Sequence, residues 1–363
     1  MPYQHHLPAT YLAFFSRENI HPRRERKVHV ADLIAKRLYI AKAQNLAAKR
    51  DVYTEWMDET WRGIEANLSQ AVQALFSRTL SADLWLRCLV PFVASLLVRG
   101  PDADKRYNLQ VGNFANEELS FGKSATGDGW DIGRCLEFQR LLAPILAGHW
   151  VLLKAAGEGE IITSDTAWMG WLEPSSKKSS LCVPLTPRHV LGIIPETRRP
   201  ILKFIDGQWR PAISYITLAE NNHLSLNKVI AEAAERCIYG ASQSVVSPYI
   251  ELTPLGQTGL RDYTRLDFLT GAQAIPHEFT WQALVAKLDR EPSLIDSFSL
   301  DFVRDAKQLQ SGWMPRLVLP GNLPRFLPGL RVVEDTIEID LYTIEAREFR
   351  EIVSQYIYGW SIS

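Results

Sequence analysis

The chain has 363 residues, of which 46% are hydrophobic and 22% are charged, and its formal net charge at pH 7 is −1. This composition excludes a disordered or fibrous chain, and the length allows one large domain or two ordinary ones, either of which buries a core without disulfides or metals. A net charge near zero gives no long-range attraction to nucleic acid or to an anionic membrane, so any basic surface has to be local.

Cysteine spacing and hydropathy predict a reduced environment without a membrane. The four cysteines are widely spaced and form no Cys-x-x-Cys pair, so we interpret them as reduced thiols. The first residues lack the charged start and apolar run of a secretory signal. The most apolar stretch, 84–98, is interrupted by Arg87 and Pro91, whereas crossing a bilayer takes about twenty apolar residues. We therefore expect a cytoplasmic protein with no membrane partner.

The N-terminal third predicts one pair of strands followed by helices. Residues 27–32 and 37–40 have the composition of two strands around a turn. From about Thr54 the apolar residues recur at helical spacing as far as residue 76, which predicts one long amphipathic helix. Ser81 is placed to cap a second helix, and Gly100 to end it as a left-handed residue before a proline.

A basic cluster precedes the first predicted strand. Its members are His21, Arg23, Arg24, Arg26, Lys27 and His29. These side chains are able to contact phosphates. A solvated loop between two early elements explains them more simply, and we prefer that interpretation.

Residues 116–130 are rich in glycine and polar side chains and predict an exposed, irregular loop. Gly122-Lys123-Ser124 invites comparison with a phosphate-binding loop. The Walker pattern, however, needs a glycine where Glu117 stands. We therefore exclude a nucleotide cradle here and expect a third helix over about 132–146.

Strands and turns dominate from residue 149 onwards. Residues 149–154 and 160–163, joined by a Gly157-Glu158-Gly159 turn, predict a hairpin. Further strands are expected at 181–185, 190–194 and 213–218, covered by a helix over 225–239. Strands at 330–333 and 336–340 and a helix at about 343–356 follow. The sequence thus predicts an α+β fold in which a helical N-terminal half packs against an antiparallel sheet built from sequential hairpins.

Three places offer candidate site chemistry. Glu338 and Asp340 would share one face of a strand, an arrangement that some metal-dependent nucleases use. Two acids on a solvated sheet face are common, so we favour a structural role and leave the metal question open. Asp165 follows Thr163 and Ser164 where a predicted strand leaves the sheet, and sites are often built at such positions. The alternative is that this carboxylate caps the next turn.

The N-terminus carries the third candidate. His5 and Tyr11 offer polar groups beside Leu12 and Phe15, which pack as a helical pair. For His5 the alternative to catalysis is a buried, hydrogen-bonded histidine.

An ordered set of short motifs resembles one bacterial family. The motifs are His5-x-x-Pro8-x-x-Tyr11-Leu12-x-x-Phe15, Asp51-Val52-Tyr53-Thr54, a helix with Glu59 reaching Ile64-Glu65, Glu160 to Asp165, Val183 to Pro187, and Leu226-Asn227 opening a helix that ends near 234–239. Together they resemble the family called domain of unknown function 4238. The resemblance covers about the first two-thirds of the chain, so we divide it into a family-like core, 1–245, and a C-terminal extension packed on the same unit, 246–363.

The resemblance implies no activity, only positions to examine. They are His5, Tyr11, Glu65, Thr163, Ser164, Asp165, Asn227 and Arg236. Our first hypothesis is an enzyme acting on nucleic acid or nucleotides in bacterial defence or toxicity. In it His5 or Asp165 is the general base or a metal ligand, while Tyr11, Thr163, Ser164, Asn227 and Arg236 bind substrate.

The second hypothesis is a non-catalytic binding or scaffold protein that recognises a protein or peptide partner through an aromatic surface. Convergence of His5, Asp165 and Asn227 in one cleft favours the enzyme, and their dispersal as caps favours the scaffold. On the first hypothesis, Asp165 should matter more for activity than for folding.

Overall fold

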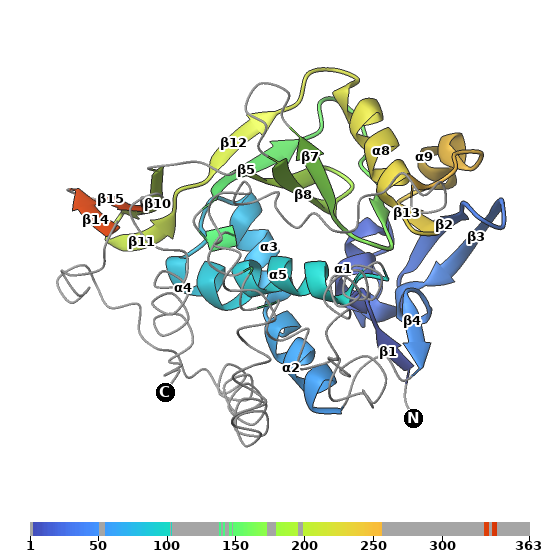
Figure 1. Cartoon of the computed structure of the whole chain (residues 1–363), viewed down its shortest axis with the longest axis horizontal. Coiled ribbons are helices and arrows are strands. Elements are labelled where there is room, and N and C mark those ends of the chain that lie inside the picture. Colours follow the sequence, from blue (N-terminus) through green and yellow to red (C-terminus); the bar gives the residue numbers. More distant parts are fainter. Residues whose placement is uncertain are drawn as a thin grey trace, which may run out of the picture.

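The structure is a computed structural model of the whole chain. It describes residues 3–50, 55–101, 148–172, 179–194, 199–255, 330–333 and 336–339, together with positions 103, 138, 141, 145 and 146. The fold is α+β, as predicted: helices dominate the N-terminal part, and sheets that are mostly antiparallel follow (Figure 1). The predicted 116–130 loop and the 343–356 helix lie outside the described residues, as does most of the predicted helix at 132–146. The division at residue 245 stays a prediction.

The first predicted strands form a hairpin, which confirms that expectation. β2 (Lys27–Asp32) pairs antiparallel with β3 (Arg37–Lys42). β13 (Cys237–Gly240) continues the sheet on the other side of β2 and is followed by β6 (Thr163–Ser164), which gives the order β3-β2-β13-β6. β3 is therefore an edge strand. A separate pair is formed by β1 (Tyr3–His5) and β4 (Ala48–Arg50).

The predicted long helix is two helices. α2 (Glu55–Glu65) and α3 (Leu68–Phe76) are separated because Asn67, with φ −105° and ψ 10°, leaves the helical region. Helical spacing of apolar residues continues across this break, since both helices turn their apolar sides to the same core. A short helix, α1 (Ala9–Leu12), precedes them.

Ser81 caps the next helical segment, as predicted, by accepting the N–H of Leu84 at 3.2 Å. The segment runs through α4 (Ala82–Leu84), a π-helical turn (Trp85–Leu89) and α5 (Val90–Arg99). Every residue of α5 is buried, which confirms a core helix. The prediction that Gly100 ends this helix in the left-handed conformation is wrong, because Gly100 has φ −57° and ψ 157°.

The hairpin predicted over 149–163 is wrong. β5 (His149–Lys154) pairs with β9 (His189–Ile194) and, in parallel, with β12 (Ser214–Thr217), in a sheet of order β12-β5-β9-β8-β7. The chain then crosses to the other sheet, where β6 pairs with β13. Two antiparallel strands complete the five-stranded sheet: β8 (Ser179–Thr186) pairs with β9, and β7 (Met169–Leu172) pairs with β8.

The helix predicted over 225–239 is shifted. α8 (Asn222–Ala233) begins earlier and ends earlier, and the last predicted helical residues form strand β13 instead. Apolar side chains of α8 pack on the β2–β13 sheet in a second core cluster that includes Ala31, Leu226, Ile230 and Ile238. A short helix, α9 (Gln243–Val246), follows. The expected helix over a sheet is therefore present, and it contacts β6 of one sheet and β7 of the five-stranded sheet that contains β5.

The strands expected near residues 330 and 336 form a hairpin of β14 (Leu330–Val333) and β15 (Thr336–Ile339). β15 also pairs with β10 (Arg199–Ile205), which in turn pairs with β11 (Gln208–Pro211).

In the core, the rings of Trp85 and Trp150 meet edge to face, with ring centroids 5.3 Å apart. No helix in the described ranges is long and apolar enough to cross a bilayer.

Candidate functional site

Tyr11 ties the N-terminal segment to two strands from the middle of the chain. Its hydroxyl donates to the carbonyl of Pro184 at 2.7 Å and lies 2.7 Å from Thr163 Oγ1. Because the carbonyl only accepts, the tyrosine proton goes to Pro184, and Thr163 donates to Tyr11. Both side chains are fully buried. Burial raises the pKa of Tyr11 well above its usual range, so the hydroxyl stays protonated.

Replacing Tyr11 by phenylalanine should destabilise the fold by about 1–2 kcal/mol, because a buried carbonyl and a buried hydroxyl each lose a partner. Urea unfolding measures this as a lower midpoint with an unchanged slope. Tyr215→Phe is the matched control, since its hydroxyl also donates to a carbonyl, that of Leu75, from a half-buried position. We expect a smaller loss there, and equal losses would contradict the role of Tyr11.

The Asp165 carboxylate binds main-chain groups at the start of β13. Its Oδ1 accepts the N–H of Glu235 at 2.9 Å, and its Oδ2 accepts those of Arg236 and Cys237 at 2.8 and 3.0 Å. The residue is 5% exposed. Burial raises the pKa of Asp165 to about 6, against the opposing effect of the three N–H groups. This geometry favours the capping alternative over a site open to substrate.

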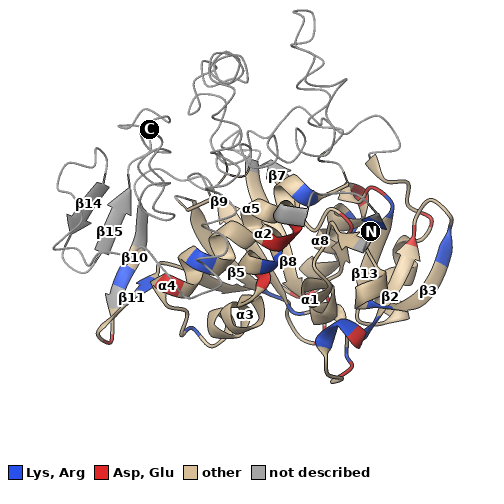
Figure 2. Cartoon of the chain, turned by 90° about the horizontal axis from the view of Figure 1, so that it is seen from below, with Lys and Arg blue, Asp and Glu red and all other residues tan. Residues whose placement is uncertain are grey.

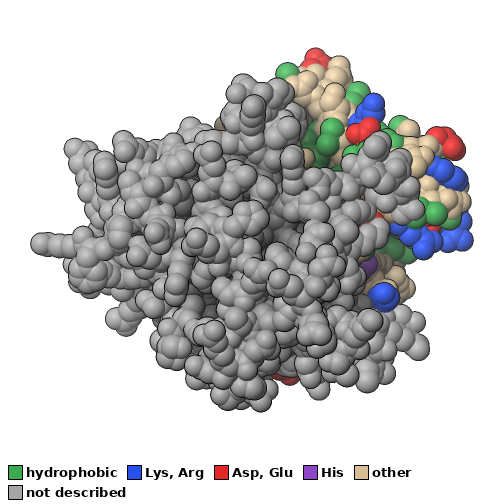
Figure 3. Space-filling model, in the orientation of Figure 1, with side chains coloured by type: hydrophobic (Ala, Val, Ile, Leu, Met, Phe, Trp, Pro, Cys, Tyr) green, Lys and Arg blue, Asp and Glu red, His purple; other side chains and the backbone are tan. Residues whose placement is uncertain are grey.

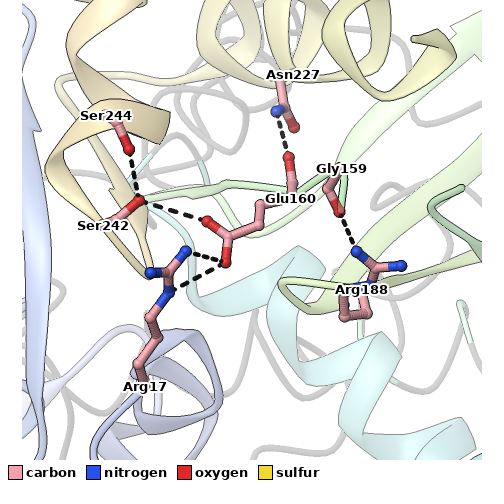
Figure 4. Close-up of polar contacts among 7 residues, drawn as sticks. All are labelled: Arg17, Gly159, Glu160, Arg188, Asn227, Ser242 and Ser244. Carbon is pink, nitrogen blue, oxygen red and sulfur yellow. Dashed lines mark hydrogen bonds and ion pairs between the residues drawn. The ribbon is translucent and has the colours of Figure 1, made fainter. Parts of the chain in front are cut away.

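Asn227 serves the main chain in the same way. From α8 its Oδ1 accepts the N–H of Ile162 at 3.0 Å, and its Nδ2 donates to the carbonyl of Glu160 at 2.7 Å. These two hydrogen bonds take the place of those that a neighbouring strand would form with the main chain of residues 160–162. Figure 4 shows this contact beside the Glu160 carboxylate, which binds Arg17 and Ser242.

Ser164 and Arg236 complete the group around β6 and β13. The Ser164 hydroxyl lies 2.8 Å from that of Thr166, inside the turn that follows β6. Arg236 donates through Nε and Nη2 to Oδ2 of the buried Asp32, at 2.9 and 2.7 Å. Its side chain is 58% exposed. Of the five residues predicted to bind substrate, Arg236 alone presents its side chain to solvent.

His5 lies apart from that group, on the β1–β4 pair. Its Nδ1 is 3.1 Å from the carbonyl of Leu46. Since a carbonyl only accepts, Nδ1 carries the proton and Nε2 of the neutral ring keeps its lone pair. Burial is the main reason that the pKa of His5 falls below 6.5, and the nearby Arg99 lowers it further. The half-buried imidazole is therefore neutral at pH 7.

A largely buried ion pair, in which the Arg99 side chain is 3% and the Glu65 side chain 17% exposed, holds the main chain of His5. Arg99, at the end of α5, binds the Glu65 carboxylate through Nη1 and donates through Nη2 to the His5 carbonyl at 2.7 Å. Its guanidinium also lies over Trp61, 5.3 Å from the ring centroid. Burial raises the pKa of Glu65, and Arg99 opposes that effect. The family resemblance pointed to Glu65, but the sequence analysis missed Arg99. The one feature of the sequence that could have indicated Arg99 is its position as a charged residue at the end of an apolar helix.

The structure thus gathers Tyr11, Thr163, Ser164, Asp165, Asn227 and Arg236 around β6 and β13 and leaves His5 in another sheet. Glu338 belongs to β15, and Asp340 lies outside the described residues. Within the part of the chain that the structure describes, no three His, Cys, Asp or Glu side chains are placed to hold a metal ion.

Comparison with known proteins gives no relative to argue from. No protein family, no curated protein and no solved structure matches this chain.

Proposed function

We propose that the protein is an enzyme acting on nucleic acid or nucleotides, with His5 as its general base. The observation that carries the proposal is the state of the imidazole: Leu46 fixes the proton on Nδ1, and the low pKa keeps Nε2 ready to accept a second one. In phosphodiester or nucleotide chemistry, Nε2 would take the proton of the attacking hydroxyl or water.

The environment of His5 supports this role. Arg99 and Glu65 hold its main chain from the buried side, so the ring is oriented before substrate arrives. The substrate class is supported by charge. Every exposed charged side chain between residues 3 and 49 is basic, which suits a phosphate-bearing substrate. We place such an activity in bacterial defence or toxicity.

Replacing His5 by alanine should slow turnover by a factor of about one hundred or more, the usual contribution of a general base. The assay follows labelled single- and double-stranded DNA and RNA, together with nucleoside triphosphates, with and without Mg²⁺. The rate of the parent protein should rise with pH through a value below 6.5 and then level off, because only neutral His5 accepts a proton.

His149→Ala is the matched control. That histidine is also half-buried at a strand end, and its Nε2 is hydrogen-bonded to the Ser214 hydroxyl at 2.8 Å. The His149→Ala variant should turn over substrate at the rate of the parent protein. A His5→Ala protein that turns over substrate as fast as the parent, with a normal melting temperature, would remove His5 from the reaction.

A non-catalytic binding or scaffold protein for a protein or peptide partner is the second candidate. It is favoured by the dispersal of the three residues expected to converge in an enzyme: His5 lies in another sheet, and the polar atoms of Asp165 and Asn227 bind main-chain groups. If the parent protein turns over none of the substrates in the assay, this second function is the better supported one.

A further inference from the structure

The charge of the chain is unevenly distributed over its surface. Between residues 3 and 49 the exposed charged side chains are Arg17, Arg24, Lys27, Lys36, Arg37, Lys42 and Lys49. The three acids of the same stretch are not exposed and are each engaged locally. Glu18 accepts the N–H of Lys27, Glu25 binds Lys42, and Asp32 binds Arg236. The net charge of −1 for the whole chain conceals this local excess of positive charge.

Four of these cations lie at the end of the β2–β3 hairpin, on the turn before it and on the β4 strand that follows it. This basic end consists of Arg24, Lys27, Lys42 and Lys49. Lys27 and Lys42 are directly opposite each other across β2 and β3. Arg24 belongs to the short helical turn that leads into β2. Figure 2 marks Lys and Arg positions in blue on β3 and on nearby turns, beside red acidic positions, and Figure 3 shows Lys and Arg side chains at the right edge of the described surface.

This arrangement has an electrostatic cost in the free protein. Like charges directly opposite each other on neighbouring strands destabilise a sheet. Crowding extends to Arg26, whose pKa is lowered by burial and by the nearby Arg23. Within the described part of the chain, no carboxylate forms an ion pair with the side chain of Arg24, Lys27 or Lys49, whereas Glu25 pairs with Lys42. A bound anion with several charges would relieve the repulsion.

The basic end leads directly to His5. After β3 the chain makes one helical turn (Ala43–Asn45), reaches Leu46, whose carbonyl holds the imidazole, and enters β4. There Lys49 is opposite Gln4, next to the pair formed by His5 and Ala48. Because successive residues of a strand point to opposite faces, the Lys49 side chain shares a face with Gln4, and the His5 ring is on the other face.

We infer that the basic end, Arg24, Lys27, Lys42 and Lys49, binds the sugar-phosphate backbone of a nucleic acid. The substrate class rests on the proposed function. A polynucleotide fits better than a single phosphate, because the cations come from a helical turn, a strand pair and β4, and a duplex carries about one charge per 1.7 Å. A lipid surface is less suited, since the exposed apolar residues nearby, Ile20 and Ile40, are not neighbours in the chain and do not form an apolar face.

The test measures binding of fluorescent 20-nucleotide single strands and 20-base-pair duplexes, of DNA and of RNA, by anisotropy between 50 and 200 mM NaCl in EDTA. The variant Arg24→Gln/Lys27→Gln/Lys49→Gln removes three exposed cations and leaves the Lys42–Glu25 pair intact. For a duplex, we expect at least a tenfold weaker affinity at 100 mM NaCl and a salt-dependence slope reduced by about 0.9 for each lost contact.

A matched control removes the same charge elsewhere. Lys154→Gln/Lys203→Gln/Lys228→Gln replaces three exposed lysines far along the chain, and it should bind like the parent. Equal weakening by both variants would show that net charge, not the basic end, determines binding. Absence of binding to any nucleic acid, or binding only to vesicles of 70% phosphatidylcholine and 30% phosphatidylserine, would overturn the inference.

The outcomes separate this inference from the proposed function. If the parent binds nucleic acid through the basic end but cleaves nothing, the binding surface stands and the enzyme proposal fails. If the parent cleaves nucleic acid through His5 while the basic-end variant binds and cleaves normally, the enzyme stands and this surface is wrong.

Discussion

Replacing Asp165 by alanine is expected to lower the free energy of unfolding by about 3 kcal/mol or more. The reason is that three main-chain N–H groups, those of Glu235, Arg236 and Cys237, lose their acceptor in a buried place. An unsatisfied buried donor costs about 1–3 kcal/mol. Asp165→Asn should also be destabilised. Its amide nitrogen would replace one of the two carboxylate oxygens, and an amide nitrogen cannot accept a hydrogen bond from the main-chain N–H that faces it. Denaturant and thermal unfolding of both variants measure these losses.

Asp83→Asn is the control for this prediction, since its side chain is 54% exposed and in a surface ion pair with Arg87. It should change stability by less than about 0.5 kcal/mol. The opposite result for Asp165→Asn, normal melting with loss of activity, would support the sequence-based expectation that this carboxylate matters more for activity than for folding.

Arg99→Met should cost about 3–5 kcal/mol of stability, because it leaves the Glu65 carboxylate buried without its counter-ion. The same change releases the His5 carbonyl, which Arg99 binds at 2.7 Å. The double variant Glu65→Leu/Arg99→Met removes both charges and should recover part of the loss. Unfolding of the two single variants and the double variant forms a cycle that measures the coupling.

The exposed pair of Arg62 and Asp58 on α2 supplies the control, with Arg62 62% exposed. Arg62→Met should cost at most about 1 kcal/mol, the usual value for a surface ion pair. A Glu65→Leu/Arg99→Met protein no more stable than Arg99→Met alone would contradict the buried-charge explanation. If the double variant folds but has lost the activity assigned to His5, the pair also positions that residue.

The sequence by itself determined the parts of this protein that depend on near neighbours. Alternation and turn residues located the β2–β3 hairpin, and the hydroxyl of Ser81 marked the start of a helix three residues from the N–H that it binds. A predominantly apolar stretch, too short to cross a bilayer, identified α5 as a core helix. These features depend on residues that are close together in the chain. The stretch of sequence that predicts each element therefore also includes the residues that the element contacts.

Only the tertiary structure decided which strands pair and what the polar residues do. β5 has the pattern of a hairpin strand, but its partners β9 and β12 lie far along the chain, and no local signal separates them from the nearer segment at 160–163. α8 ends at Ala233 and β13 begins nearby, where Asp165, some seventy residues earlier, binds the N–H groups that a continuing helix would have used. Arg99 meets His5 across a similar gap. Apolar patterns predict that a residue is buried, but a polar side chain takes its role from the atoms that folding brings to it.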